Sequence, residues 1–129
     1  PPRQPIEQAC REAHASGAAI LAVCVKDTVK RQIAQKSSSK DATIFIETTV
    51  PRGDLWLAQT PQVFKRELIV SLFERLTREA PDQEVTDDAS ICELFKHPVA
   101  LIPSSAANLK ITRPEDLLIA EAYLRAKLV

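Results

Sequence analysis

Hydrophobic and polar positions follow helical and strand periods in alternation, which indicates an α/β protein. Residues 5–16 form the first expected helix, with Pro5 in its first turn and Gly17 at its end. Its apolar positions have helical spacing and are Ile6, Ala9, Cys10 and Ala13. Residues 20–25 are a continuous apolar run that suits a strand in the middle of a parallel sheet, where helices cover both faces. A helix followed by a glycine turn and a buried strand is typical of the chain connectivity of α/β proteins.

Two β-branched segments predict a β-hairpin over residues 29–50. Residues 29–33 and 43–50 would be its strands, and the polar stretch around Ser37 to Ser39 would be its tip. A hairpin that projects from an α/β core cannot bury both of its faces by itself. We therefore expect this hairpin to dock on another surface.

The remaining pattern predicts helices alternating with short extended segments. Residues 62–80 are the clearest helix, because an apolar stripe faces a charged one. Thr86 is a candidate N-cap for the next helix. Residues 99–102 and 108–112 are expected to be extended, and a last helix is expected from about Pro114. The inward-facing positions of that last helix are expected to be Leu117, Ala120, Leu124 and Leu128.

Composition limits the classes of function. The chain carries 17 basic and 17 acidic residues, so we expect neither nucleic acid nor a membrane surface as a partner. No apolar stretch approaches the ~20 residues of a membrane span. Cys10, Cys24 and Cys92 are scattered in apolar runs, which predicts small buried thiols in a reducing, cytosolic-type compartment. The chain has no methionine and opens on Pro1-Pro2, so we expect a processed or truncated piece.

Several catalytic signatures are absent from the sequence. Because its only glycines are Gly17 and Gly53, the chain has no GxGxxG motif and no Walker loop. His14 and His97 have no partner at metal-ligand spacing, so both are expected to be solvated. No serine or cysteine occupies a nucleophile elbow, and a nucleophile-based hydrolase is therefore not expected.

Basic and hydroxyl side chains occur where the expected elements end. Lys26 and Thr28 follow the buried strand, at the end of a parallel sheet where ligands bind. Thr86 begins a helix whose free backbone N–H groups can bind an anion. Arg52 offers a bidentate guanidinium and Lys110 a point charge, which together suit a phosphate monoester. Solvated basic side chains and a simple helix cap explain the same pattern, so spacing alone leaves both interpretations open.

Four sequence blocks resemble one enzyme family in the order in which they occur. They are V-K-D-T-V-K-R (25–31), R-G-D-L-W-L-A-Q-T-P-Q-V-F (52–64), V-T-D-D-A-S (85–90) and N-L-K-I-T-R-P-E-D-L (108–117). From about Gly17 onward the chain closely resembles the methylerythritol-phosphate cytidylyltransferases of the non-mevalonate isoprenoid pathway. The resemblance implies that residues 1–129 are the C-terminal portion of a single Rossmann-like nucleotidyltransferase domain. Residues 29–50 would then be a protruding β-arm that builds a homodimer.

The resemblance also implies a reaction and a site. The family joins CTP to 2-C-methyl-D-erythritol 4-phosphate and releases pyrophosphate, with magnesium as cofactor. Arg52 and Lys110 would position the phosphate of the sugar alcohol, and Thr28 and Thr86, with Lys26, would line its pocket. The family's glycine-rich loop and its magnesium-binding acid belong to the N-terminal half. We therefore expect no metal ligand in this chain, negligible CTP binding and no activity for the 129 residues alone.

Two alternatives stay open at this point. A ribitol-phosphate cytidylyltransferase would perform the same reaction on a different acceptor, although Leu55-Trp56 and residues 86–90 favour the isoprenoid enzyme. A non-catalytic dimerisation or binding module would keep the fold without the reaction. The resemblance is compatible with a cytoplasmic enzyme of bacteria or with an enzyme of the plastid stroma.

Overall fold

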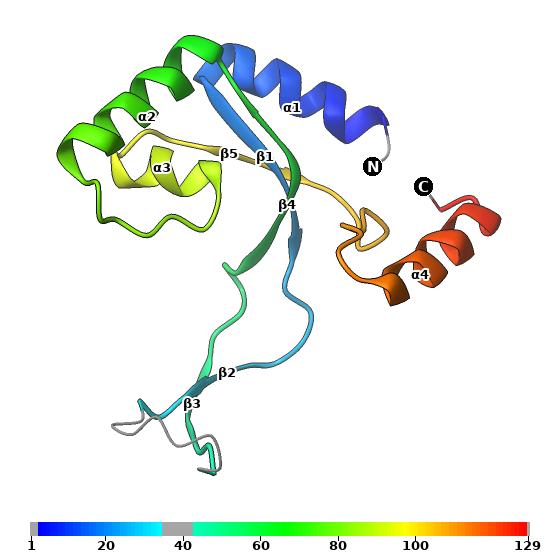
Figure 1. The fold of residues 1–129 in the computed structure, drawn as a ribbon. Coiled ribbons are helices and arrows are strands. Elements are labelled where there is room, and N and C mark those ends of the chain that lie inside the picture. Colours follow the sequence, from blue (N-terminus) through cyan, green and yellow to red (C-terminus); the bar gives the residue numbers. More distant parts are fainter. Residues whose placement is uncertain (1–2, 35–42, 129) are drawn as a thin grey trace. The chain divides into compact units, whose positions relative to one another are not determined.

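The computed structural model describes residues 3–34 and 43–128, which form two compact units (Figure 1). The hairpin unit comprises Cys24–Leu57, and the core unit comprises Pro1–Val23 and Ala58–Val129. The predicted serine tip lies outside the described residues. In chain order the elements are α1 (Arg3–Ser16), β1 (Ala18–Cys24), β2 (Val29–Gln32), β3 (Ile46–Val50), β4 (Trp56–Phe64), α2 (Arg66–Glu79), α3 (Asp88–Leu94), β5 (Ala100–Pro103) and α4 (Pro114–Arg125).

The strand β1 lies in the middle of a mixed sheet with the order β4-β1-β5. It runs parallel to β5, with Ala19 opposite Ala100. The backbone N–H of Lys65, just after β4, donates to the carbonyl of Gly17, just before β1 (2.8 Å). The end of β4 therefore lies beside the start of β1, and these two strands are antiparallel. The predicted central strand is confirmed, whereas its antiparallel neighbour β4 was not predicted.

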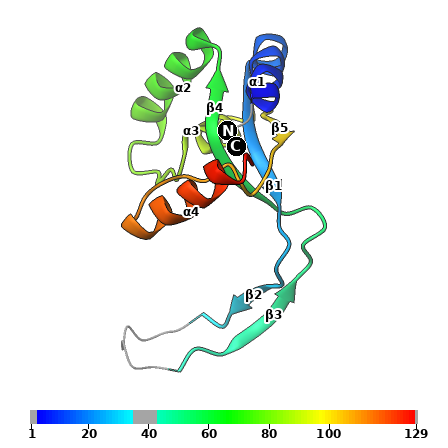
Figure 2. The same cartoon turned by 90° about the vertical axis from the view of Figure 1, so that its right-hand side faces the viewer.

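Helices cover both faces of β1, as its continuous apolar run predicts (Figure 2). One face of the sheet packs on α1, and the other packs on α2 and α3. The α1 side buries Ala9, Ala13, Ala19, Leu21 and Ile102. The opposite side buries Ala18, Leu72, Ile91 and Cys92. Because successive strand residues point to opposite faces, adjacent residues of β1 join different cores.

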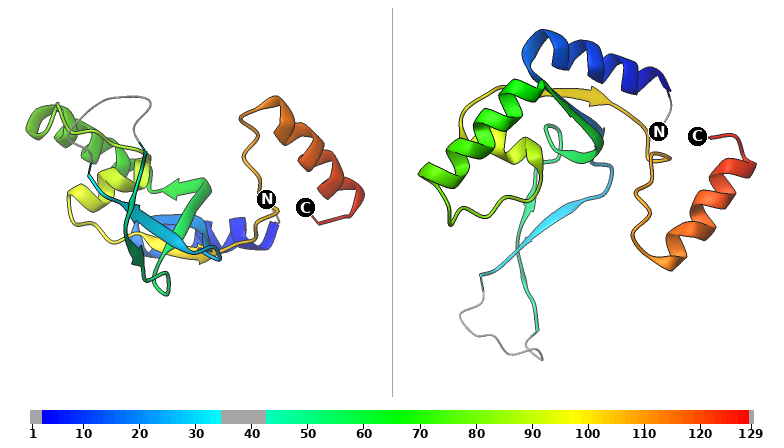
Figure 3. Two further views of the ribbon diagram at one scale, coloured as in Figure 1. Left: turned by 90° about the horizontal axis from the view of Figure 1, so that it is seen from below. Right: turned by 45° about the horizontal axis from the view of Figure 1, so that its top comes forward.

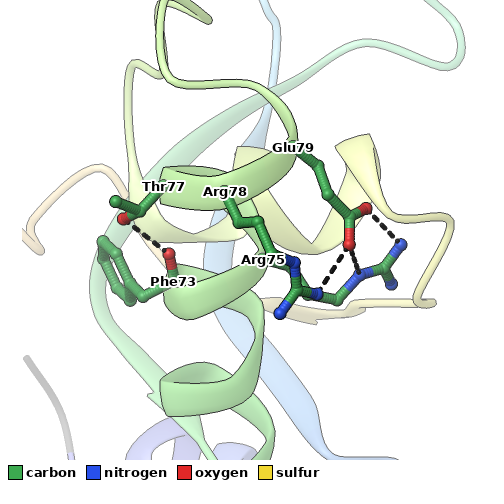
Figure 4. A network of polar contacts seen from close by, with 5 residues as sticks. All are labelled: Phe73, Arg75, Thr77, Arg78 and Glu79. Atoms are coloured by element: carbon green, nitrogen blue, oxygen red, sulfur yellow. Dashed lines mark hydrogen bonds and ion pairs between the residues drawn. The ribbon is translucent and has the colours of Figure 1, made fainter.

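The helix α2 buries Leu72 and carries a charged network on its exposed side (Figure 4). Glu79 accepts hydrogen bonds from Arg75 (3.1 Å) and Arg78 (2.8 Å), and these hold the pKa of the Glu79 carboxyl below its ordinary value. The Arg75 guanidinium also lies 4.1 Å from the centre of the Phe95 ring, a cation–π contact from α2 to the end of α3. Figure 3 shows α2 and α3 packed side by side.

The predicted helix over residues 62–80 begins too early. Gln62 to Phe64 belong to β4, and α2 begins at Arg66. Val63 packs against the α1 core, and Phe64 packs against the α2–α3 core. Strand pairing with β1 therefore determines the structure of these residues, because only an extended segment can send consecutive side chains into both cores.

The last helix begins at Pro114 as predicted, but of the four residues expected to face inward only Ala120 is half-buried, and the three leucines are exposed. Leu117 is 53% exposed, Leu124 is 65% exposed and Leu128 is 58% exposed. Leu118 and Ile119 are exposed as well. Apolar residues thus occur all round α4, and their spacing could not select a buried face.

The cysteine prediction holds for one residue of three. Cys92 is fully buried, and burial raises the pKa of its thiol, with smaller contributions from the Glu93, Asp88 and Asp87 carboxylates. Cys10 and Cys24 are exposed free thiols instead. Cys10 has helical spacing with Ile6 and Ala13, but its side chain is exposed whereas that of Ala13 is buried.

Gly17 ends α1 in a conformation that other residues rarely adopt. Its φ is +102°, and its N–H donates to the carbonyl of Ala13 (2.8 Å). The His97 ring packs beside it and donates from Nε2 to the carbonyl of Ser16 (3.0 Å). His97 is therefore half-buried and hydrogen-bonded, which corrects the expectation that it is solvated.

Gly17→Ala is expected to lower the free energy of unfolding of the full-length protein by about 1–3 kcal/mol. A Cβ at Gly17 would lie 2.8 Å from His97 Nε2 and 2.9 Å from Leu68 Cδ2, in addition to the strained φ. The matched control is Gly53→Ala, because no described atom lies within 4 Å of a Cβ built at Gly53. Denaturant unfolding of both variants checks this prediction, and equal destabilisation by the two would contradict it.

Candidate functional site

Arg52, Lys26 and Thr28 lie at the base of the hairpin, within the hairpin unit. Arg52 begins a turn in which the Leu55 N–H donates to the Arg52 carbonyl (3.1 Å). The Arg52 guanidinium donates through Nη1 to the backbone carbonyl of Lys26, so its side chain links the two roots of the hairpin. All three predicted side chains are exposed. The Arg52 guanidinium therefore uses one N–H for the bond to Lys26, and its other N–H groups can donate to a ligand.

The hairpin itself has the predicted strands. β2 pairs with β3 in antiparallel register, with Val29 opposite Val50. Beyond the paired strands, the Ile33 N–H donates to the Phe45 carbonyl (3.0 Å). Ile44 and Phe45 are each 63% exposed, so apolar side chains face solvent here. This arrangement agrees with the expectation that the hairpin cannot bury its own faces.

Lys110 lies in the core unit, in the irregular segment between β5 and α4. The Ser104 N–H, directly after β5, donates to the Ala22 carbonyl (2.8 Å). A tight turn follows, in which the Asn108 N–H donates to the Ser105 carbonyl (3.1 Å). Residues 108–112 form no strand, which corrects the expected extended piece. Lys110 is exposed at the end of this turn.

A pair of side-chain amides joins this turn to β4. Asn108 Nδ2 donates to Gln59 Oε1 (3.2 Å) and to the carbonyl of Thr60 (2.8 Å). Gln59 Nε2 donates in return to the carbonyl of Ser105 (3.0 Å). Asn108 is only 9% exposed, so its amide depends on these partners. The turn before Lys110 is therefore held against the sheet.

Asp116 holds the chain on the other side of Lys110. Its Oδ2 accepts from the backbone N–H groups of Thr112 (2.8 Å) and Arg113 (2.9 Å). These hydrogen bonds hold the pKa of the Asp116 carboxyl below its ordinary value, the Thr112 N–H most strongly. Because its pKa is lowered, the Asp116 carboxylate is ionised and keeps these hydrogen bonds at neutral pH. It loses them only as the pH falls through that pKa. Lys110 thus lies between two anchored segments.

Thr86 lies next to the start of α3 but does not cap it. Asp87 is the N-cap, and its Oδ1 accepts from the Ser90 N–H (2.9 Å). The Ser90 Oγ donates back to the Asp87 carbonyl (2.6 Å). The capping role predicted for Thr86 is therefore wrong by one residue, since Asp87 and Ser90 form a closer reciprocal pair. Thr86 remains an exposed hydroxyl beside that cap.

Gln62 of β4 bonds the same end of α3. Its Nε2 donates to Asp87 Oδ2 (2.7 Å), and its Oε1 accepts from the Ala89 N–H (3.1 Å). The N–H groups of Ala89 and Ser90 are therefore already bonded within the protein. The expected anion site at the backbone of this helix is not supported for these two groups.

The candidate residues thus fall into two groups. Arg52, Lys26 and Thr28 belong to the hairpin unit, and Thr86 and Lys110 belong to the core unit. Sequence reasoning missed the side chains that hold the second group, namely Gln59, Gln62, Asn108 and Asp116. Gln59 and Gln62 stand in the L-W-x-A-Q-T-P-Q block, which was the available signal. Because the pattern assigned Gln62 to a helix, the sequence did not predict its hydrogen bonds to the start of α3.

The part of the chain that the structure describes contains neither a cluster of metal-ligating side chains nor a helix able to cross a membrane. No group of three or more His, Cys, Asp or Glu side chains in residues 3–34 and 43–128 lies close enough together to hold a metal ion. Among those residues, no helix is both long and apolar enough to cross a bilayer.

Comparison with known proteins matches nearly the whole chain to one family. The family model of 2-C-methyl-D-erythritol 4-phosphate cytidylyltransferase (IspD) matches residues 2–126. The protein of that name from Syntrophus aciditrophicus is 42% identical over 113 residues, which are 88% of this chain and 44% of that protein. A chloroplastic protein of that name from Oryza sativa subsp. japonica is 38% identical over 122 residues, which are 95% of this chain and 38% of that protein.

A solved structure extends the match to the fold. The crystal structure of 2-C-methyl-D-erythritol 4-phosphate cytidylyltransferase from Thermus thermophilus has a TM-score of 0.74 and 32% identity. The match covers 95% of this chain and 55% of that one, so the chain spans about half the length of the relatives it matches. The resemblance and the nucleotidyltransferase fold that it implied are confirmed. The chain belongs to the 2-C-methyl-D-erythritol 4-phosphate cytidylyltransferase family.

Proposed function

We propose that this chain is the C-terminal part of an enzyme that joins CTP to 2-C-methyl-D-erythritol 4-phosphate in isoprenoid biosynthesis. The products are the CDP-linked alcohol and pyrophosphate. The family match over residues 2–126 carries this proposal, since it includes all five predicted site residues. These residues are Lys26, Thr28, Arg52, Thr86 and Lys110.

The reaction needs cations, because both reactants are anions. An oxygen of the methylerythritol phosphate forms a bond to the α-phosphorus of CTP, and the bond from that phosphorus to the leaving pyrophosphate breaks. Arg52 and Lys110 would hold the attacking phosphate in line and offset the repulsion between the two reactants. The bond from Arg52 to the Lys26 carbonyl limits the freedom of the guanidinium before substrate arrives. Thr28, Thr86 and Lys26 would complete the pocket as hydrogen-bond donors.

Magnesium is the cofactor that the family implies. When bound, it would neutralise part of the charge of the triphosphate. In this family the magnesium-binding acid belongs to the N-terminal half, so we assign magnesium binding to that part of the full-length protein. The residues of this chain then act on the phosphate of the alcohol.

We further propose a homodimer that forms through the hairpin. Ile44, Phe45 and Ile46, which lead into β3 of the hairpin unit, are 62–63% exposed. A second copy of the chain would cover these side chains, which are too apolar to favour solvent. The relatives include bacterial proteins and a chloroplastic one, so we assign the enzyme to the bacterial cytoplasm or the plastid stroma.

An assay of the full-length protein tests the function. Pyrophosphate release is measured with CTP and magnesium, using either methylerythritol phosphate or ribitol phosphate as acceptor. We expect turnover with methylerythritol phosphate, and neither turnover nor saturable CTP binding by calorimetry for the 129-residue chain alone. Preference for ribitol phosphate would indicate the related cytidylyltransferase. A folded full-length protein that uses neither acceptor would indicate a non-catalytic binding or dimerisation module.

A further inference from the structure

The strand β4 contributes two glutamines whose amides bond to the two segments of the core unit that carry Lys110 and Thr86. Gln59 bonds the turn before Lys110, through the Ser105 carbonyl (3.0 Å) and the Asn108 side chain (3.2 Å). Gln62 bonds the start of α3, directly after Thr86. Both glutamines are half-buried and come from the same nine-residue strand. One strand therefore holds both segments.

Each glutamine uses both ends of its amide. Gln59 donates to a backbone carbonyl and accepts from the Asn108 amide. Gln62 donates to the Asp87 carboxylate and accepts from the Ala89 N–H. A glutamate, a leucine or an alanine cannot satisfy both kinds of partner. Each of these two positions therefore requires a side-chain amide. A polar residue that only faced solvent would have no such requirement.

The anchored partners lie very close to the candidate site residues along the chain. Asn108 precedes Lys110 by two residues, and Asp87 follows Thr86 directly. Loss of the Gln59 amide removes the bond to the Ser105 carbonyl and one of the two bonds of the Asn108 amide, which keeps only the Thr60 carbonyl as acceptor. Because Asn108 is almost fully buried, water cannot readily replace the lost partner, and the turn is expected to move. Such a movement would displace the Lys110 ammonium, which is itself exposed.

We propose that Gln59 and Gln62 are positioning residues, which hold Lys110 and Thr86 where the substrate phosphate binds. This proposal rests on the proposed function of those two residues. Gln59 acts together with Asn108 on Lys110, and Gln62 acts through the start of α3 on Thr86. Neither glutamine needs to touch the substrate.

The test is a double-mutant cycle in the full-length enzyme, combining Gln59→Leu with Lys110→Ala. Gln59→Leu alone is expected to lower kcat/KM for methylerythritol phosphate by about 10²-fold, the typical effect of misplacing a catalytic group by about 1 Å. The KM for CTP is expected to stay unchanged. The double variant is expected to be no less active than Lys110→Ala alone, because a displaced lysine and an absent lysine are equivalent. Gln62→Leu with Thr86→Ala is expected to behave in the same way, with smaller losses.

A stability control separates positioning from folding. Leu72→Val changes a buried residue of α2 and is expected to reduce the melting temperature while the folded enzyme keeps its kcat/KM. If Gln59→Leu does not fold, Gln59→Glu replaces it in the cycle, since it keeps the size of the side chain and loses the donor to Ser105.

One result would contradict only the positioning role of Gln59, and a different result would contradict the proposed function of Lys110. If the losses from Gln59→Leu and Lys110→Ala multiplied in the double variant, Gln59 would act independently of Lys110 and the positioning role would be wrong. If Lys110→Ala alone kept normal activity, the proposed function of Lys110 would fail first, and the role of Gln59 would fail with it.

Discussion

Lys110→Ala is expected to lower the turnover of the full-length enzyme by about 10²–10³-fold. A cation that aligns two anionic reactants acts mainly in the transition state, where charge repulsion between them is greatest. Loss of one such contact typically costs about 2.7–4 kcal/mol of transition-state stabilisation. The fold should persist, because Lys110 is exposed and its segment is held by Asn108 and Asp116. Steady-state pyrophosphate release, with thermal unfolding in parallel, measures both effects.

The matched control for this variant is Lys65→Ala. Lys65 is also an exposed lysine of the core unit, and it stands before α2 with its backbone N–H bonded to Gly17. We expect this variant to keep near-normal turnover, so that a loss specific to Lys110 cannot arise from net charge. Normal turnover of Lys110→Ala would instead show that Lys110 is an ordinary solvated lysine.

Mixing full-length Arg52→Ala with full-length Lys110→Ala is expected to restore activity that neither variant has alone. Arg52 lies at the base of the hairpin that we propose as the dimer arm. If this arm crosses to a second subunit, residues at its base approach the two-fold axis and can enter the partner's pocket. Each site would then combine Lys110 and Thr86 of one subunit with Arg52 and Thr28 of the other. A two-fold dimer holds two such composite sites.

The two sites of a mixed dimer differ in the number of substitutions that they contain. One site contains both substituted residues, Arg52→Ala and Lys110→Ala, and the other site contains neither. A mixed dimer is therefore expected to recover up to half of the normal activity. Subunit exchange is confirmed by mass, and each variant incubated alone is the control. If exchange is complete and activity does not return, Arg52 belongs to the site of its own subunit, and the dimer has only a structural role.

Local patterns predicted the elements that a short window of sequence can specify. The apolar spacing of Ala9 and Ala13 with the stop at Gly17 predicted α1, and the apolar run over 20–25 predicted a central strand. The β-branched segments predicted the paired strands of the hairpin. Each of these follows from side-chain periodicity or from the unusual φ of a glycine, which depend on neighbours in the chain.

Other features depended on partners far away in the sequence. The pattern assigned Gln62 to a helix, whereas pairing with β1 makes it part of β4. Asn108 appeared to be part of an extended segment, whereas it lies in a turn bonded to Gln59, 49 residues earlier. The helix cap was expected at Thr86, and the bonds of Asp87 with Ser90 and Gln62 place it one residue later.

The sequence by itself determined the family, the α/β class, the order of most elements and the choice of Arg52, Lys110 and three further residues as candidates. The roles of these five residues stay predictions. Only the tertiary structure decided how the segments next to Lys110 and Thr86 are bonded, because the hydrogen bonds of Gln59 and Gln62 join residues that lie 25 to 49 positions apart. Such bonds form when the strand β4 packs into the sheet, and they require no periodicity in the chain around either partner.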